Sequence, residues 1–215
     1  MHAEANVVWT KSGPTIEISE GGAVATATGS GMDGWQSAVC DAPFCTMKDQ
    51  GRYYVEIEWL AGEKLMAGIA GPKFDPTQGK PGEMATRSSP DGWAYSAWSD
   101  GRLYQANRPV DWAGHETGAA VGDRIGLLLD LSRGTLSLRI NDVWHGDMIT
   151  EGEGLHGPWH WSVDLFKESG DKPGSSVRLR NLPAPSDPGI ERRLRDAAKQ
   201  GDAAAIESLL AAGAQ

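Results

Sequence analysis

Two glutamates on one predicted strand, Glu56 and Glu58, are the residues whose spacing most suggests acid–base chemistry. Alternate side chains of a strand point to the same face, so these two carboxylates would lie side by side. Glycosidases use such a pair, and they also need a cleft and a raised pKa on one of the two acids. A solvated strand face is the favoured interpretation, and a glycosidase is the weaker alternative.

The other candidate chemical groups lack the spacing of a known site. Among the histidines at 115, 145, 156 and 160, one pair, His156 and His160, is four residues apart, but it lies outside any predicted helix, and Cys40 and Cys45 form a single Cys-x4-Cys pair. The Gly-x-Gly-x-x-Gly pattern occurs at 29–34 and at 152–157, but neither stretch precedes a predicted helix as a phosphate loop does, and no serine nucleophile elbow occurs in the sequence. We therefore expect reduced thiols, no metal, no cofactor and no enzymatic activity.

Composition and charge exclude several kinds of partner. The chain has 215 residues and a net charge of −9, which disfavours nucleic acid and an anionic membrane surface. Residues 1–20 lack the basic head and apolar run of a signal peptide, and no apolar stretch approaches the ~18 residues of a membrane span. We expect a cytoplasmic or nuclear protein whose ligand is not a small molecule.

The elements that would position any site are strands. Ile125, Leu127 and Leu129 recur every second residue, as do Leu136, Leu138 and Ile140. Gly134 between the two runs can adopt the positive φ that a short hairpin turn requires, so the range 122–141 is predicted to be a β-hairpin with one apolar face.

Further alternating segments extend this pattern along the chain. A hairpin is expected from Thr15–Ile18 and Val24–Thr28, and an edge strand from Val39 to Met47. The ranges 72–91 and 105–121 are predicted loops, and the loop 29–35 would place Trp35 at one end of the fold. About a dozen strands with frequent turns predict a mainly β protein, an antiparallel two-sheet β-sandwich.

The nine tryptophans fall into two groups by their place in this pattern. Six lie within strand patterns and are expected mostly in the core or at its edge: Trp9, Trp35, Trp59, Trp93, Trp98 and Trp161. Three fall in or beside loops, where recognition is the more frequent role: Trp112, Trp144 and Trp159.

Several segments resemble SPRY domains in the order that this family has them. Gly122–Asn141 resembles the family's central hairpin, and Gly51–Ile57 is similar to its Gly-x-x-Tyr-x-Glu-Val strand. Gly68–Ala70 is similar to its Gly-Val-Ala strand, and Asp91–Tyr95 falls where the family carries Ser-Trp-Gly-Tyr. The likeness covers residues 50–183. Ala94, Leu138 and Asp142 depart from the usual Gly, Phe and Gly, so no relative's ligand is transferred.

The resemblance implies a SPRY or concanavalin-like jelly-roll sandwich that binds proteins without catalysis, as an adaptor does. Its rim loops would hold a peptide or loop of a partner protein, and here these loops are 72–91 and the turn after Leu165. The expected partner-binding residues are Phe74, Met84, Arg87, Phe166 and Lys167. For Phe166 the alternative is a plug at the end of the sandwich. A carbohydrate-binding lectin is the rival function, because tryptophan faces stack on sugar rings.

The pattern changes after the sandwich, which we expect to span 1–183. A linker over 184–189 leads to a predicted helical pair over 190–215, with Asp187 capping the first helix and Asp202 the second. The sequences of Asp196–Asp202 and Leu209–Ala214 are similar to that of an ankyrin repeat. One such repeat does not bury its own apolar stripe, so we expect the chain to be part of a longer SPRY–ankyrin protein.

Overall fold

The computed structural model divides the chain into two units, Met1–Leu182 and Pro183–Gln215, which are treated separately below. It describes residues 7–29, 34–40, 51–78, 86, 89–90, 92–116, 118–152, 155, 158–168, 170–185, 197–198 and 201–211. Within this part of the chain, no helix is long and apolar enough to cross a membrane.

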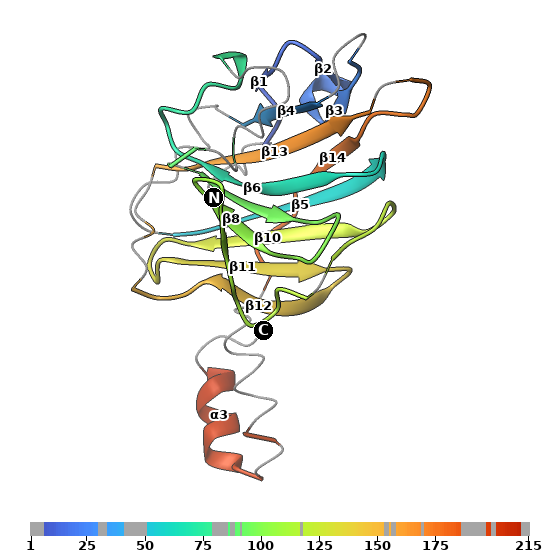
Figure 1. The fold of residues 1–215 in the computed structure, drawn as a ribbon. Helices are drawn as coiled ribbons and strands as arrows, with labels where there is room; N and C mark the ends of the chain where they lie inside the picture. The colour runs from blue at the N-terminus through green and yellow to red at the C-terminus, as the bar shows by residue number, and fades with distance from the viewer. Residues whose placement is uncertain are drawn as a thin grey trace. The chain divides into compact units, whose positions relative to one another are not determined.

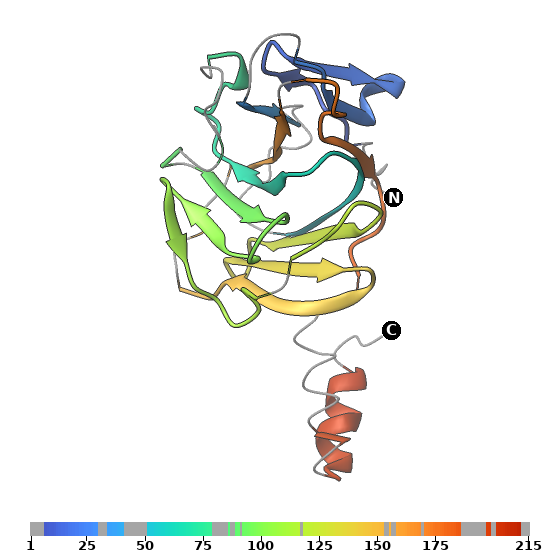
Figure 2. The ribbon, with the colours of Figure 1, turned by 45° about the vertical axis from the view of Figure 1, so that its right-hand side comes forward.

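The larger unit consists of two antiparallel sheets of seven strands each (Figures 1 and 2). The first sheet has the order β1 (Lys11–Ser12), β4 (Gly34–Val39), β13 (His160–Lys167), β6 (Leu65–Ala70), β7 (Gly92–Ser96), β8 (Leu103–Gln105) and β9 (Arg108–Val110). The second sheet has the order β12 (Val143–Ile149), β11 (Thr135–Ile140), β10 (Arg124–Asp130), β5 (Arg52–Ala61), β14 (Ser176–Arg180), β3 (Val24–Ala27) and β2 (Ile16–Ser19). The predicted mainly β, two-sheet antiparallel sandwich is confirmed.

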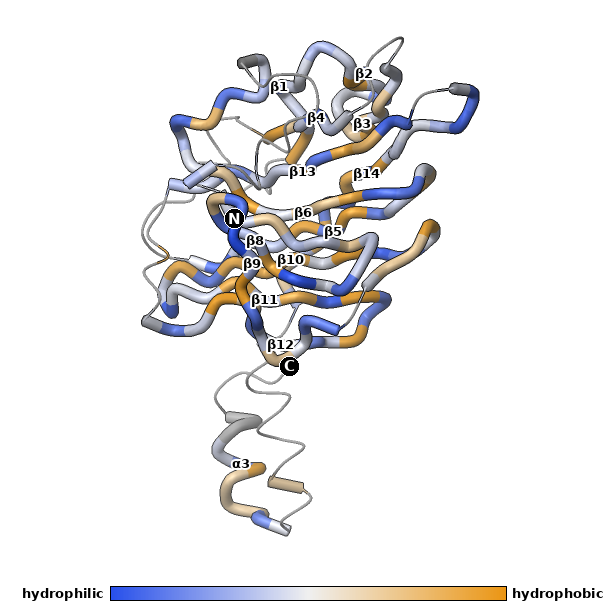
Figure 3. Tube along the Cα trace, viewed as in Figure 1, coloured by the Kyte–Doolittle hydropathy of each residue, from blue (hydrophilic) through white to orange (hydrophobic). Residues whose placement is uncertain are grey.

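The central hairpin is β10 and β11, as predicted. Leu127 pairs with Leu138 and Leu129 with Leu136, and all four side chains are fully buried in the core between the sheets. Gly134 has the expected positive φ of 67° in the turn. Figure 3 shows the same division along the chain, with hydrophobic residues concentrated in the strands and hydrophilic residues in most of the turns.

A side chain at the end of β10 fixes the turn that follows it. The Asp130 carboxylate accepts hydrogen bonds from the backbone N–H groups of Ser132 (3.0 Å) and Arg133 (3.1 Å). The position of Asp130 between Leu129 and Leu131 predicts that its side chain faces away from them and binds the amides of its own turn, and this is confirmed. Because the bonds are local, the sequence around the turn was sufficient to predict them.

Two strand predictions in the first sheet were wrong. Gly34–Val39 is β4, whereas a loop was expected as far as Trp35 and a strand from Val39; the residues from Asp41 to Met47 lie outside the described part. Arg108–Val110 is β9, which lies inside a predicted loop. Neither strand shows the alternation of apolar and polar residues by which a strand is predicted from sequence. In β4 the residues of both faces are buried, and β9 is a short edge strand.

The turn between β8 and β9 provides the first testable prediction. Gln105 pairs with Arg108, so Ala106 and Asn107 form a two-residue loop, and their φ angles of 47° and 63° match a type I′ turn. Alanine is disfavoured in this left-handed region, whereas asparagine tolerates it. We expect Ala106→Asn to raise the free energy of unfolding by about 1 kcal/mol in urea titrations. The control Ala113→Asn, at an exposed turn residue without a positive φ, should change it by less than about 0.5 kcal/mol.

In the smaller unit the second predicted helix is present as α3 (Ala203–Ala211). Asp202 caps it as predicted, because its carboxylate accepts a 3.0 Å hydrogen bond from the Ala205 N–H.

A helix also ends just before Asp202. Ala197 and Ala198 are helical, and Gly201 has a φ of 69°. The N–H of Asp202 binds the carbonyl of Ala197 (2.9 Å), and the N–H of Gly201 binds that of Ala198 (3.2 Å), which is a Schellman motif. The rest of the first predicted helix lies outside the described residues, so the ankyrin-like helical pair is not confirmed.

Candidate binding surface

The outer face of the first sheet carries a second hydrophobic cluster, separate from the core between the sheets. Strand pairing creates this cluster: Trp35 of β4 is opposite Phe166 of β13, and Ala94 of β7 is opposite Tyr104 of β8. Met66 of β6 completes it, with Phe166 and Tyr104 only partly buried. Phe166 therefore packs on the outside of the sheet, in place of the suggested plug at the sandwich end.

Three aromatic rings of this region contact one another, and we call Trp35, Trp98 and Phe166 the aromatic cluster. The ring centroids of Trp35 and Phe166 are 5.4 Å apart with an interplanar angle of 53°, and those of Trp35 and Trp98 are 6.4 Å apart at 49°. Tilted aromatic pairs at such distances are favourable beyond the burial of their area. Trp35 is buried, whereas Trp98 remains 39% exposed, so the cluster presents one large aromatic face to solvent.

A lysine lies over the aromatic cluster. The Nζ atom of Lys64 is 4.2 Å from the ring centroid of Phe166 and 5.2 Å from that of Trp98. Both distances are within the range of a cation–π interaction. The backbone of Lys64 is fixed independently, because its carbonyl accepts a 2.6 Å hydrogen bond from the Ser175 hydroxyl.

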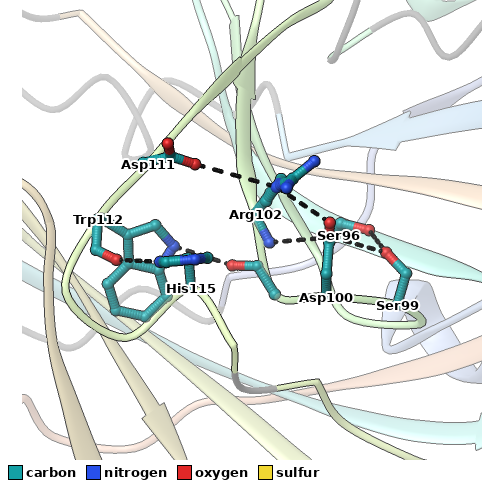
Figure 4. A network of polar contacts seen from close by, with 8 residues as sticks. Ser96, Ser99, Asp100, Arg102, Asp111, Trp112 and His115 are labelled. Carbon is teal, nitrogen blue, oxygen red and sulfur yellow. Dashed lines mark hydrogen bonds and ion pairs between the residues drawn. The ribbon is translucent and has the colours of Figure 1, made fainter.

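A polar network holds the turn that carries Trp98 (Figure 4). The Ser96 and Ser99 hydroxyls are 2.8 Å apart, and the Arg102 Nε lies 3.1 Å from an Asp100 carboxylate oxygen. Burial raises the pKa of Asp100, but hydrogen bonds from the Ser99 hydroxyl and the Arg102 backbone outweigh it, so the pKa is below its usual value. A charged Asp100 therefore stabilises the turn at neutral pH.

Trp112 supports the same turn from the loop that follows β9. Its indole Nε1 donates a 2.8 Å hydrogen bond to the Gly101 carbonyl, and His115 Nδ1 lies 2.7 Å from the Trp112 carbonyl (Figure 4). The side chain of Trp112 is buried. Trp112, which lies in a loop, thus has a structural role. Trp98, which was predicted to lie in the core or at its edge, is exposed.

The other two loop tryptophans are also less exposed than a role in recognition would require. Trp159 is buried in the core, although its position beside a loop suggested recognition. Trp144 is half-buried on β12, where the Arg139 guanidinium lies 5.6 Å from its ring centroid. Of the six tryptophans in strand patterns, four are buried and Trp93 packs against the core, as expected, whereas Trp98 is exposed. The departures are Trp98, Trp112 and Trp159, because burial depends on contacts with distant parts of the chain as well as on the local sequence.

Next to the aromatic cluster, the predicted long loop is anchored to the outer face of the sheet. Asp164 of β13 has no exposed surface, and its carboxylate accepts hydrogen bonds from the Ser37 hydroxyl and from the Thr86 N–H, the latter at 3.2 Å. Thr86 is itself 1% exposed. Asp164 and Phe166 are two residues apart on one strand and share its outer face, about 7 Å apart along the chain. The anchor and the aromatic cluster are therefore neighbours.

The structure describes three of the five expected partner-binding residues. Phe166 belongs to the aromatic cluster. Phe74 follows the other end of β6, where its N–H binds the Gly71 carbonyl at 3.0 Å. The Lys167 ammonium donates to three carbonyls of its own turn, those of Glu168 (3.2 Å), Gly170 (3.0 Å) and Lys172 (2.5 Å). Met84 and Arg87 lie outside the described residues.

The paired glutamates lie on the second sheet, and the solvated face expected for them is wrong for Glu56. Its side chain is 3% exposed. The carboxylate lies between two guanidinium groups, 3.4 Å from Nε of Arg124 and 3.3 Å from Nη1 of Arg180. Both guanidinium groups thus engage the Glu56 carboxylate as ion-pair partners within the sheet.

Possible metal ligands are dispersed in the part of the chain that the structure describes. Groups of three or more His, Cys, Asp or Glu side chains able to hold an ion do not occur there. His160 Nδ1 lies 3.1 Å from the carbonyl of Cys40, and the Cys40 thiol is buried.

Comparison with known proteins identifies the fold and leaves the function open. No family model matches the chain, and no curated protein sequence matches it. The crystal structure of the SPRY domain of human HERC1 matches with a TM-score of 0.59 and 18% identity, over 81% of this chain and 97% of that one. The TRIM65 PSpry domain matches with a TM-score of 0.60 and 15% identity, over 83% and 90% of the two chains.

A third solved structure, that of stonustoxin, matches with a TM-score of 0.58 and 15% identity. The match covers 81% of this chain and 28% of that one. The larger unit therefore has a SPRY-like fold. At these identities the likeness concerns the fold, and the function has to be argued from the surface.

Proposed function

We propose that this protein is a non-catalytic module that binds a segment of a partner protein on the outer face of its first sheet, with the aromatic cluster as the main contact. The observation that carries the proposal is the 39% exposure of Trp98 next to the half-buried Phe166. Aromatic residues are enriched at the energetic centres of protein interfaces, where they become fully desolvated.

The surroundings of Trp98 support recognition because they keep its ring in place. The turn from Ser96 to Arg102 is held by the Ser96–Ser99 contact, by the Asp100–Arg102 pair and by the Trp112 hydrogen bond. A ring on a fixed turn loses little conformational entropy when a ligand covers it. The fixed position of the ring therefore supports a binding role for Trp98 and not an exposed side chain without a function.

The long loop belongs to the proposed surface through its anchor. Thr86 binds Asp164 beside the aromatic cluster, and Met84 and Arg87 flank Thr86 in the sequence. Met84, Arg87 and Phe166 are therefore kept as proposed contacts. The proposal does not depend on Phe74 or on the Lys167 ammonium.

A display experiment on the full chain tests this function. Peptides selected from a random library should lose affinity about tenfold with Trp98→Ala, because removing an interface tryptophan generally costs more than 1 kcal/mol. The control is Trp144→Ala, a half-buried tryptophan on the second sheet, which should leave affinity unchanged. Binding would be measured by calorimetry. Equal affinity of the wild type and the Trp98 variant would remove the aromatic cluster from the site.

The exposed ring of Trp98 also favours one competing function, a lectin, because an indole face stacks on sugar rings. A glycan array on the same protein separates the two. Binding of glycans that Trp98→Ala abolishes, with no peptide selected, would replace peptide recognition by carbohydrate recognition.

A further inference from the structure

We propose that the aromatic cluster recognises a cationic side chain, a lysine or arginine of the partner, and that Lys64 occupies this position in the unbound chain. This inference rests on the proposed function and specifies the chemistry of the same surface. The Lys64 ammonium would then be an internal substitute for the ligand's charged group.

The contacts of Lys64 are those of a bound cation. Its Nζ lies over the Phe166 ring at 4.2 Å and near Trp98 at 5.2 Å, while Trp35 packs against both rings. Among the described residues, no hydrogen bond or ion pair reaches this ammonium. The faces of the rings carry the negative end of their quadrupole and stabilise this charge at short range, while the Glu168 carboxylate interacts with it at longer range.

The neighbouring carboxylates are bound to a different lysine. Lys172 Nζ lies 2.9 Å from Glu63 and 2.7 Å from Glu168. The hydrogen bond from Lys172 and its charge lower the pKa of Glu168, and the charge of Lys64 lowers it further. Lys64, next to Glu63 in the sequence, is thus directed to the rings although acids are close by. Lys64 therefore lies on the aromatic cluster, while Glu63 and Glu168 lie beside it and pair with Lys172.

Charge complementarity favours a cationic ligand over an anionic or neutral one. The chain has a net charge of −9, which attracts a basic segment of a partner. A guanidinium or ammonium group can stack on the exposed face of Trp98 while Glu63 and Glu168 lie at the border. The net negative charge, the negative face of the Trp98 ring and the two glutamates would repel a carboxylate once Lys64 has moved away.

Self-occupation by Lys64 has a measurable cost for an incoming cation. A ligand that needs the open state binds with an affinity reduced by the fraction of molecules that are open. A cation–π contact of the usual strength corresponds to roughly a tenfold reduction. Removing the Lys64 side chain should therefore strengthen cation binding, which is the opposite of the usual effect of deleting a surface residue.

The test uses tetramethylammonium as the cation and tert-butanol as a neutral molecule of similar shape. Each is titrated into the full chain while the indole N–H signals are followed by NMR. We expect Lys64→Ala to bind tetramethylammonium about ten times more tightly than the wild type, with no gain for tert-butanol. Lys73→Ala, at an exposed lysine after β6, is the matched control and should behave as the wild type. Lys64→Ala with Trp98→Ala should lose the gain.

A second measurement guards against collapse of the rings in the Lys64 variant. In the wild type, the side-chain methylene protons of Lys64 should show ring-current shifts that disappear as tetramethylammonium saturates the site. Binding that leaves these shifts unchanged, or an equal response to tert-butanol, would overturn the proposal. Selected peptides that need Trp98 but contain no essential Lys or Arg would also refute it, and peptide binding as such would stand.

Discussion

Replacing Asp164 by alanine is expected to lower the free energy of unfolding of the larger unit by about 3 kcal/mol. The carboxylate has no exposed surface and accepts hydrogen bonds from the Ser37 hydroxyl and the Thr86 N–H. A buried donor that loses its acceptor costs about 1–3 kcal/mol, and the alanine variant leaves the Ser37 hydroxyl and the Thr86 N–H without this acceptor. The loss should appear in urea unfolding followed by tryptophan fluorescence.

The control for this prediction keeps the acceptor. Asp164→Asn retains one carbonyl oxygen in the same place and should cost clearly less than the alanine variant. Asp171→Ala, at an exposed aspartate, should change stability by less than about 0.5 kcal/mol. Hydrogen exchange adds a local measurement, because the Thr86 amide should lose its protection in Asp164→Ala. Unchanged protection there would show that Asp164 does not anchor the loop.

Gly68→Ala is expected to have an effect of similar size for a steric reason. A Cβ atom at Gly68 would lie 1.8 Å from the carbonyl oxygen of Trp93 and 2.8 Å from its carbonyl carbon, both backbone atoms of β7. Backbone in a central strand cannot move away as a flexible side chain can, so β6 and β7 must separate. We expect a loss of about 3 kcal/mol in urea unfolding.

The matched control is Met66→Leu on the same strand and the same face. Met66 is 1% exposed, and exchange for leucine conserves volume, so the cost should be below about 1.5 kcal/mol. A Gly68→Ala protein as stable as the wild type would mean that the close approach of β6 and β7 is not required.

Both predictions concern the platform under the proposed binding surface. Gly68 allows β6 to lie close to β7, and Asp164 fixes the loop beside Phe166. A ligand surface on the outer face of a tightly paired sheet keeps its shape without the ligand. This rigidity fits recognition of a partner segment by a preformed surface.

The sequence was sufficient for features that depend on neighbours along the chain. Leu127 and Leu138 each belong to a run of apolar residues that recur at every second position, and the structure pairs them in the core. The Asp130 turn and the Asp202 cap were also predicted correctly, because each involves a side chain and amides two or three residues away. Repeating such local patterns many times was enough to predict an antiparallel sandwich.

The candidate site was predicted only in part, since its members come from distant parts of the chain. The family resemblance predicts Phe166, while the sequence pattern places Trp35 at a sandwich end and Trp98 in the core or at its edge. Lys64 gave no signal at all, because a lone lysine before a strand is an ordinary surface residue.

By itself the sequence determined which segments become strands with one apolar side, because alternation of residue type is a local property with a period of two. The tertiary structure decided which strands are neighbours and therefore which side chains meet. Pairing of β4 with β13 brings Trp35 to Phe166 across 130 residues of chain, and the turn after β7 adds Trp98. Exposure follows from those long-range contacts, and it is exposure that makes a tryptophan available to a partner.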